Sequence, residues 1–281
     1  MHDTTDIKEA VRERYARTAT AGESCCGPSP SGGSGCGCGS SSQGMDTAAL
    51  GYSSDDLEAL PDGADMGLGC GNPLAMLELR EGETVLDLGS GGGIDCFIAS
   101  TRVGPGGRVI GVDMTPEMIA KARRNATSGG YDNVEFRLGE IEHLPAADAS
   151  IDAIISNCVI NLAPDKAQVF ADAFRVLKPG GRLSVSDIVL LGEIPVEVRD
   201  SVEAYVACLA GAMLRDDYLA LIAEAGFSDI RVTGETGFEL EDVVASDLVD
   251  EFRRHTGATD EELRAAAVRF QSIRVAATRP A

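Results

Sequence analysis

The sequence has no apolar run that approaches the roughly 18–20 residues needed to span a bilayer. Its first residues, MHDTTDIKEA, also lack the apolar stretch of a secretory signal. These two absences predict a soluble, cytoplasmic protein that has no membrane partner. Hydrophobic residues make up 44% of the 281 positions, so the chain can bury a sizeable core and global disorder is excluded.

Positive charge is also scarce: 24 Lys and Arg residues face 45 Asp and Glu residues, which gives a net charge of −21. A field of that sign repels phosphate backbones, so we expect no nucleic-acid partner. The only lysines are Lys8, Lys121, Lys166 and Lys178. Carboxylate-rich, lysine-poor surfaces are typical of proteins that work in concentrated salt, where ions screen self-repulsion. An ordinary acidic protein from a GC-rich genome is the alternative interpretation.

The sequence has eight cysteines but no C-x-x-C pair. Without such a pair, a structural zinc site is disfavoured. A disulfide framework is typical of short secreted chains, and this chain is neither short nor preceded by a secretory signal. Thiol chemistry or the binding of a soft ligand is therefore the expected use of these residues, which are Cys25, Cys26, Cys36, Cys38, Cys70, Cys96, Cys158 and Cys208.

The chain divides into three parts by composition. Residues 1–44 are expected to form a flexible N-terminal segment, with a short helical pattern in DIKEAVRERYARTA and a cysteine-rich Gly/Ser tether over residues 21–44. Residues 45–190 alternate short apolar runs with helical patterns, which predicts a doubly wound, mostly parallel α/β sheet of the Rossmann-like type. Residues 191–281 are expected to form a smaller C-terminal α+β part that binds the substrate.

A glycine-rich turn follows the first predicted strand, in the run VLDLGSGGG at residues 85–93. Glycine at such a turn permits close approach of the backbone to a ligand. The spacing is D-x-G-x-G-x-G rather than the dinucleotide-binding G-x-G-x-x-G, and it resembles the first motif of class I S-adenosylmethionine methyltransferases. This resemblance implies that the turn lies under the amino acid portion of the cofactor. The alternative is that the glycines serve packing only.

Further features fit the same cofactor, S-adenosylmethionine. Asp113 ends the second predicted strand, RVIGVDM, where a carboxylate can accept hydrogen bonds from both ribose hydroxyls, although it could instead cap a helix. The loop GEIEHLP at residues 139–145 resembles the loop that the family places beside the adenine, and KPGG at 178–181 resembles the turn before its fifth strand. The predicted cofactor-binding residues are Asp87, Gly89, Ser90, Gly91, Gly93, Asp113, Met114, Glu140, Ile141 and Asn157.

Four cysteines lie in the globular part. Ligands of open α/β sheets collect at the carboxyl ends of the strands, and Cys158 follows the fourth predicted strand at such an end. Cys96 lies one turn into the helix after the glycine-rich turn, close to the expected cofactor site. Cys70 lies in a turn-rich stretch, and Cys208 lies on a predicted helix in SVEAYVACLAGAM. Convergence of these thiols would form a site for a thiophilic acceptor.

Over residues 45–281 the sequence resembles the arsenite S-adenosylmethionine methyltransferases, on the motifs VLDLGSGGGIDC, GLGCGNP, ISNCVINL and YVACLAGA. The resemblance implies that Cys158 and Cys208 bind trivalent arsenic, with Cys70 as a third ligand and Cys96 completing the catalytic thiols. It also implies methyl transfer to arsenic, which yields S-adenosylhomocysteine and a methylated arsenical. A Cys70–Cys96 disulfide, reduced by thioredoxin or a small thiol, would supply the electrons that this reaction requires.

Other interpretations stay open from sequence. Each thiol could be a small buried hydrophobe, and Cys25 with Cys26 could capture arsenite on the tether, bind metal adventitiously or be inert. His143 and His255 are expected to be ordinary surface or loop residues. The rival functions are a methyltransferase that acts on carbon or oxygen of a small molecule, and an arsenic-sequestering or sensing protein that kept the fold.

Overall fold

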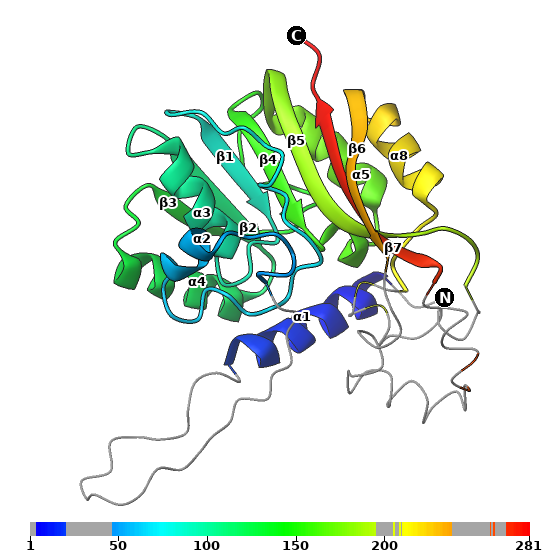
Figure 1. Ribbon diagram of the computed structural model, residues 1–281, viewed down its shortest axis with the longest axis horizontal. Coiled ribbons are helices and arrows are strands. Elements are labelled where there is room, and N and C mark those ends of the chain that lie inside the picture. The colour runs from blue at the N-terminus through cyan, green and yellow to red at the C-terminus, as the bar shows by residue number, and fades with distance from the viewer. Residues whose placement is uncertain are drawn as a thin grey trace, which may run out of the picture.

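The computed structural model describes residues 4–20, 47–194, 205, 208, 210–237, 259, 261 and 268–281. Within these residues seven strands form one sheet in the order β3-β2-β1-β4-β5-β7-β6 (Figure 1). Strands β1 to β5 pair in parallel, and β7 pairs antiparallel with both β5 and β6. The strands are β1 (Thr84–Leu88), β2 (Arg108–Asp113), β3 (Val134–Leu138), β4 (Ile151–Asn157), β5 (Leu177–Leu190), β6 (Ser228–Gly237) and β7 (Phe270–Thr278).

This architecture confirms the predicted doubly wound, mostly parallel α/β fold. The division of the chain at residue 190 stays a prediction, and the described C-terminal strands β6 and β7 extend the same sheet rather than forming one of their own. Among the residues that the structure describes, no helix combines the length and the apolar character that crossing a membrane requires.

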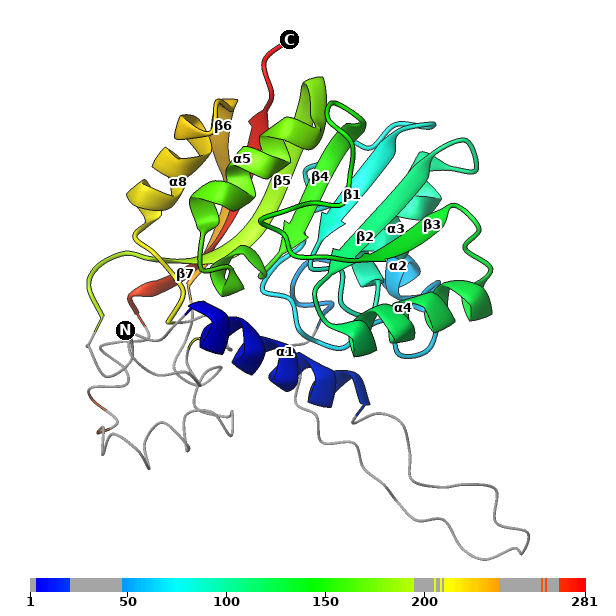
Figure 2. The same ribbon diagram turned by 180° about the vertical axis from the view of Figure 1, so that it is seen from behind.

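Helices cover both faces of the sheet, as Figures 1 and 2 show from opposite sides. They are α2 (Ser54–Glu58), α3 (Ile94–Val103), α4 (Pro116–Gly129), the short 3₁₀ turn η1 (Ile160–Leu162), α5 (Lys166–Val176) and α8 (Arg215–Glu224). Because side chains alternate along a strand, neighbouring residues of β1 enter different cores. Val85 packs with Phe97 of α3, whereas Leu86 packs with Phe170 of α5 and Tyr218 of α8.

Helix α1 (Thr4–Thr20) crosses the end of the sheet at which the parallel strands terminate (Figure 1). The expectation of a flexible segment over residues 1–44 therefore does not hold for residues 4–20. The physical reason is an apolar stripe: Val11 is 1% exposed, and Ile7 and Tyr15 pack into the same core. Residues 21–46 lie outside the described residues, so the predictions about the tether and its four cysteines stay predictions.

The docking of α1 depends on Val11, so a charged residue at this position should detach the helix. In Val11→Asp, we expect amide hydrogen exchange of residues 4–20 to accelerate by about tenfold or more, because an unpaired carboxylate cannot remain buried there. The central strands should keep their protection. Glu13→Asp is the matched control, since Glu13 is exposed. Mass spectrometry of peptic fragments measures the exchange rates. Unchanged exchange of residues 4–20 in Val11→Asp would contradict the assigned packing.

Candidate active site

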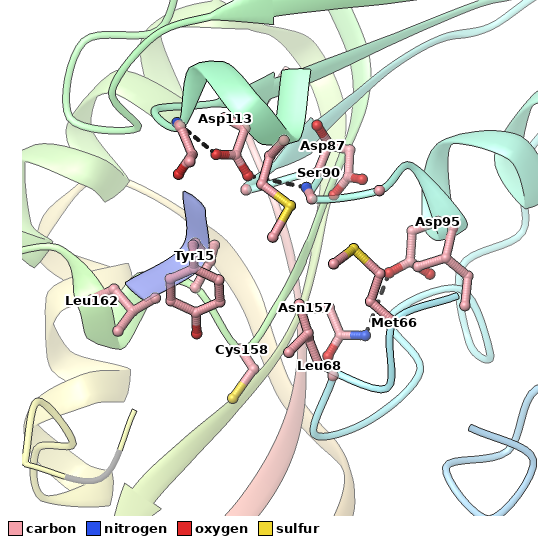
Figure 3. A pocket seen from close by; sticks show the side chains of 18 of the residues that line it. Tyr15, Met66, Leu68, Asp87, Ser90, Asp95, Asp113, Asn157, Cys158 and Leu162 are labelled. Carbon is pink, nitrogen blue, oxygen red and sulfur yellow. Dashed lines mark hydrogen bonds between the residues drawn. The ribbon is translucent and has the colours of Figure 1, made fainter. Parts of the chain in front are cut away.

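A cleft opens at the carboxyl ends of β1, β2 and β4, and α1 forms part of its wall (Figure 3). The space within it is about 1070 Å³, a volume that includes space open to solvent. Residues at these strand ends, in the 64–69 loop, in the loop after β3 and on α1 line it. Parallel strands that end together bring segments distant in sequence to one place.

The turn after β1 has the conformation that its glycines allow. Gly89 and Gly91 adopt φ values of 69° and 50°, which residues with a Cβ rarely adopt. The amides of Gly89 and Ser90 both donate to the carbonyl of Val112 on β2, at 2.8 and 2.9 Å. A Cβ on Gly89 would collide with the side chain of Val159. The glycines therefore serve both the strained turn and close packing against the segment after β4.

Asp113, the last residue of β2, holds this turn and faces the cleft. Its Oδ2 accepts from the amide of Gly91 at 3.0 Å, and its Oδ1 accepts from the amide of Thr115 at 2.8 Å. Burial raises the pKa of the Asp113 carboxyl. Each carboxylate oxygen has a second lone pair, so the group can fix the backbone and still accept from the hydroxyls of a ligand.

Two more buried carboxylates lie at the floor of the cleft. Asp95 accepts from the hydroxyl of Tyr52 at 2.7 Å, and Asp87 lies 3.2 Å from the thiol of Cys96, which donates to it. Burial raises the pKa of Asp95 to about 6 and raises that of Asp87 well above its usual value, which the neighbouring Asp95 charge reinforces. With Asp113 these groups make the cleft favourable for a cationic ligand, because a positive charge would relieve their mutual repulsion.

Asn157, at the end of β4, joins the cleft to the loop that contains Cys70. Its Nδ2 donates to the hydroxyl of Tyr52 at 3.0 Å and to the carbonyl of Gly71 at 2.8 Å, while its Oδ1 accepts from the amide of Cys70 at 3.1 Å. Asn157 is thus fully engaged between β4 and the 67–73 loop. This arrangement fixes where the loop lies relative to the turn after β1.

Eight of the ten predicted cofactor-binding residues line the cleft, and two do not. Gly93 precedes α3 with φ 100°, and a Cβ there would lie 2.7 Å from the ring of Phe97. Glu140 directs its carboxylate to Lys8 at 2.7 Å and to Arg12 at 3.7 Å, and so fastens α1 instead. Those that line the cleft are Asp87, Gly89, Ser90, Gly91, Asp113, Met114, Ile141 and Asn157.

Several residues that line the cleft were not predicted from the sequence. The stripe of α1 is visible in the sequence, but nothing in it shows that the helix packs on this cleft. Glu142 pairs with Lys8 at 2.9 Å, a contact between residues 134 positions apart that local patterns cannot reveal. The missed residues include Lys8, Val11, Tyr15, Tyr52, Asp95 and Glu142.

Three of the four predicted catalytic thiols, including that of Cys158, lie together in one cluster. Cys70, Cys158 and Cys208 are buried in one apolar cluster, to which Ile188 of β5 and Tyr15 of α1 also belong. The thiol of Cys208 donates to the carbonyl of Cys158 at 2.9 Å. Cys158 alone of the three lines the cleft, where Figure 3 shows its sulfur near the hydroxyl end of Tyr15. Cysteines from three distant segments thus meet beside the cleft.

Two of these cysteines have backbone φ angles in the left-handed region. Cys158 has φ 58° and Cys208 has φ 64°. The prediction that Cys208 lies on a helix is wrong: it lies in a turn, because a residue with this φ cannot continue a right-handed helix. Such conformations cost of order 1–3 kcal/mol at non-glycine residues and cluster at functional sites. Both of these left-handed residues carry buried thiols.

Cys96 lies apart from the other three. It is fully buried in the core between α3 and the sheet, with Phe97 and Val85, and its thiol donates to Asp87. All four described cysteines are free thiols. Within the described residues no group of three His, Cys, Asp or Glu side chains is arranged as a metal site.

Comparison with known proteins identifies the family. The model described as a methyltransferase domain matches residues 79–226, which is more than half of the chain. The chain belongs to the methyltransferase-domain family. The crystal structure of an arsenic(III) S-adenosylmethionine methyltransferase from Chlamydomonas reinhardtii is 34% identical, with a TM-score of 0.61, and the match covers 82% of this chain and 72% of that chain.

Two curated relatives add to this methyltransferase assignment. The arsenite methyltransferase of Halobacterium salinarum is 52% identical over 232 residues, which are 82% of this chain and 59% of the relative. That of Aquipseudomonas alcaligenes is 41% identical over 192 residues, which are 66% of this chain and 55% of the relative. The predicted resemblance to arsenite methyltransferases is confirmed, and the chain spans less than two thirds of the length of either relative.

The environment of Cys158 predicts how its reactivity depends on pH. Hydrogen bonds with Cys208 and Cys70, followed by burial, raise the pKa of Cys158 well above its usual value. Since only the thiolate is nucleophilic, its alkylation by iodoacetamide should keep rising with pH beyond 9, the ordinary value for the thiol. Mass spectrometry of each labelled cysteine measures the rates. A plateau at or below pH 8 would show that Cys158 ionises readily.

Proposed function

We propose that this methyltransferase transfers the methyl group of S-adenosylmethionine to arsenite. The observation that carries the proposal is the adjacency of Asn157 and Cys158: one belongs to the cleft and its hydrogen-bond network, and the next belongs to the thiol cluster. A methyl donor in the cleft and a thiophilic acceptor on the cysteines would therefore lie side by side. The relatives that are named arsenite methyltransferases support this choice.

The residues of the cleft suit the cofactor. The turn from Gly89 to Gly91 lets a ligand approach the backbone closely, and Asp113 offers carboxylate lone pairs at the end of β2. Asp87 and Asp95 would compensate positive charge on the ligand. When bound, S-adenosylmethionine supplies a cationic sulfonium with an electrophilic methyl group. Apolar lining from Val11, Met114 and Ile141, among others, excludes water from that side.

Thiolates are the soft ligands that suit trivalent arsenic. We assign Cys70, Cys158 and Cys208 as its ligands: each thiol displaces one hydroxyl of arsenite, and the thiol hydrogen leaves with that hydroxyl as water. The bound arsenic keeps its lone pair and is held in place beside the cleft, where proximity lowers the barrier. In the transfer the arsenic lone pair would form an As–C bond as the S–CH₃ bond of the sulfonium broke, and the electron pair of that bond would stay on sulfur.

Methyl transfer oxidises arsenic by two electrons, and a pair of thiolates can return them by forming a disulfide. The sequence resemblance names Cys70 and Cys96, with thioredoxin or a small thiol as the reductant that restores them. The contacts favour a partner for Cys70 within the thiol cluster, because Cys96 is held by Asp87 in another core. A cytoplasmic location, where such reductants are abundant, is part of this proposal.

Two assays separate this function from its rivals. Incubation with labelled S-adenosylmethionine and arsenite should give methylated arsenic, whereas a sequestration protein would bind arsenite without product. Cys158→Ser should lower the methylation rate by about 100-fold or more, since the acceptor loses its position beside the cleft. The matched control is Cys36→Ser, which also removes one thiol but changes a residue outside those that the structure describes. A methyltransferase that acts on carbon or oxygen would keep its activity in Cys158→Ser.

Asp113 tests the cofactor half of the proposal. Asp113→Ala should weaken S-adenosylmethionine binding by about 1–3 kcal/mol, the usual loss for charge-assisted hydrogen bonds. Arsenite affinity should hardly change, because Asp113 contacts the turn after β1 and not the thiol cluster. Calorimetric titration with each ligand separates the two effects. Unaltered cofactor affinity would remove Asp113 from the binding site.

A further inference from the structure

Asn161 lies in the 3₁₀ turn that follows Cys158, and its side chain is completely buried. Its Nδ2 donates to the carbonyl of Ile188 on β5 at 2.6 Å and to the carbonyl of Cys208 at 3.4 Å. No donor among the described residues reaches its Oδ1. A buried amide with half of its hydrogen-bonding capacity unused is costly, so its presence at this position calls for a reason.

The segment around Cys208 contacts the η1 turn at further points. The hydroxyl of Tyr205 donates to the carbonyl of Leu162 at 3.3 Å. Gly211 packs so closely that a Cβ there would collide with the carbonyl oxygen of Asn161. Within the segment, the amide of Cys208 donates to the carbonyl of Tyr205 at 2.9 Å, which closes the turn that carries the thiol.

These contacts connect two strained residues. Cys158 is held to β5 because its amide donates to the carbonyl of Ser186 at 2.7 Å, and Asn161 reaches the same strand two residues further on, at Ile188. The Nδ2 group that binds β5 also binds the turn of Cys208. Both left-handed cysteines are therefore fixed relative to one strand. For Cys208 this is done by Asn161, together with the Cys208 thiol that donates to the Cys158 carbonyl.

We propose that Asn161 is a positioning residue that holds Cys208 against Cys158, and that it thereby determines how many thiolates the site offers to arsenic. This inference rests on the proposed function and deepens it. With Asn161 in place, Cys70, Cys158 and Cys208 form a three-thiolate site. Without it the turn of Cys208 loses the side-chain bridge to Ile188 of β5, while Cys70 and Cys158 keep their own contacts with Ser186.

The test compares two arsenicals that need different numbers of thiols. Arsenite has three exchangeable positions, whereas phenylarsine oxide has two, because its phenyl group occupies the third. The full-length protein with serine at positions 25, 26, 36 and 38 is the background, so that only the described cysteines bind. In Asn161→Ala, arsenite affinity should fall about tenfold or more, while phenylarsine oxide affinity should stay within about twofold. S-adenosylmethionine affinity should be unchanged, because Asn161 does not line the cleft.

Arsenic X-ray absorption gives a direct signature of the site. The sulfur count around bound arsenite should fall from three in the background protein to two in Asn161→Ala. Gly211→Ala should give the same result by a different route, since its methyl group pushes the Cys208 turn away from Asn161. It also carries the test if Asn161→Ala fails to fold. Asn133→Ala is the matched control, because Nδ2 of Asn133 also donates to two carbonyls, at Ser100 and Gly104, away from the thiols.

The outcomes separate this inference from the proposed function. Three sulfurs and unchanged arsenite affinity in both Asn161→Ala and Gly211→Ala would overturn the role of Asn161. Equal weakening of arsenite and phenylarsine oxide would also overturn it, because the effect would then be a general structural loss. A background protein that binds no arsenite would instead overturn the assignment of the three cysteines, and with it the proposed function.

Discussion

The hydrogen bond from the amide of Cys158 to the carbonyl of Ser186 is the constraint on which the active site depends. At 2.7 Å it continues the pairing of β4 with β5 by one residue, although Cys158 has left the strand with φ 58°. This turn keeps Asn157 in the cofactor cleft and places Cys158 in the thiol cluster. Glycine would adopt the conformation without strain, but it could not bind a ligand, so the strain accompanies the chemistry.

Much of the fold could be predicted because it is specified locally. The run VLDLGSGGG needs a buried strand and then a turn with positive φ, and Gly89 and Gly91 have both the place and the conformation that this pattern predicts. The position of Cys158 after β4 follows in the same way, since short apolar runs alternate with amphipathic helices throughout residues 84–190. Parallel pairing then brings Asp113 and Asn157 to one edge without further information.

What the sequence did not reveal depends on contacts between distant segments. Cys208 lies in a helical pattern, yet its turn is imposed by Asn161 and Tyr205, and tertiary contacts override helix propensity. Cys96 is near the cofactor turn in sequence, but its position on α3 directs it to Asp87 and away from Cys158. The apolar stripe of α1 predicts a buried face without naming the surface that buries it.

The buried carboxylates connect the charge of the cleft to turnover under the proposed function. Burial raises the pKa values of Asp87, Asp95 and Asp113, and repulsion from Asp95 and Asp113 raises that of Asp87 further. A sulfonium relieves that repulsion when it binds. Methyl transfer would remove the positive charge from the cofactor and leave it on arsenic among the thiolates of Cys158 and its neighbours. The same carboxylates would therefore favour a cationic sulfonium more than the neutral sulfide that methyl transfer leaves.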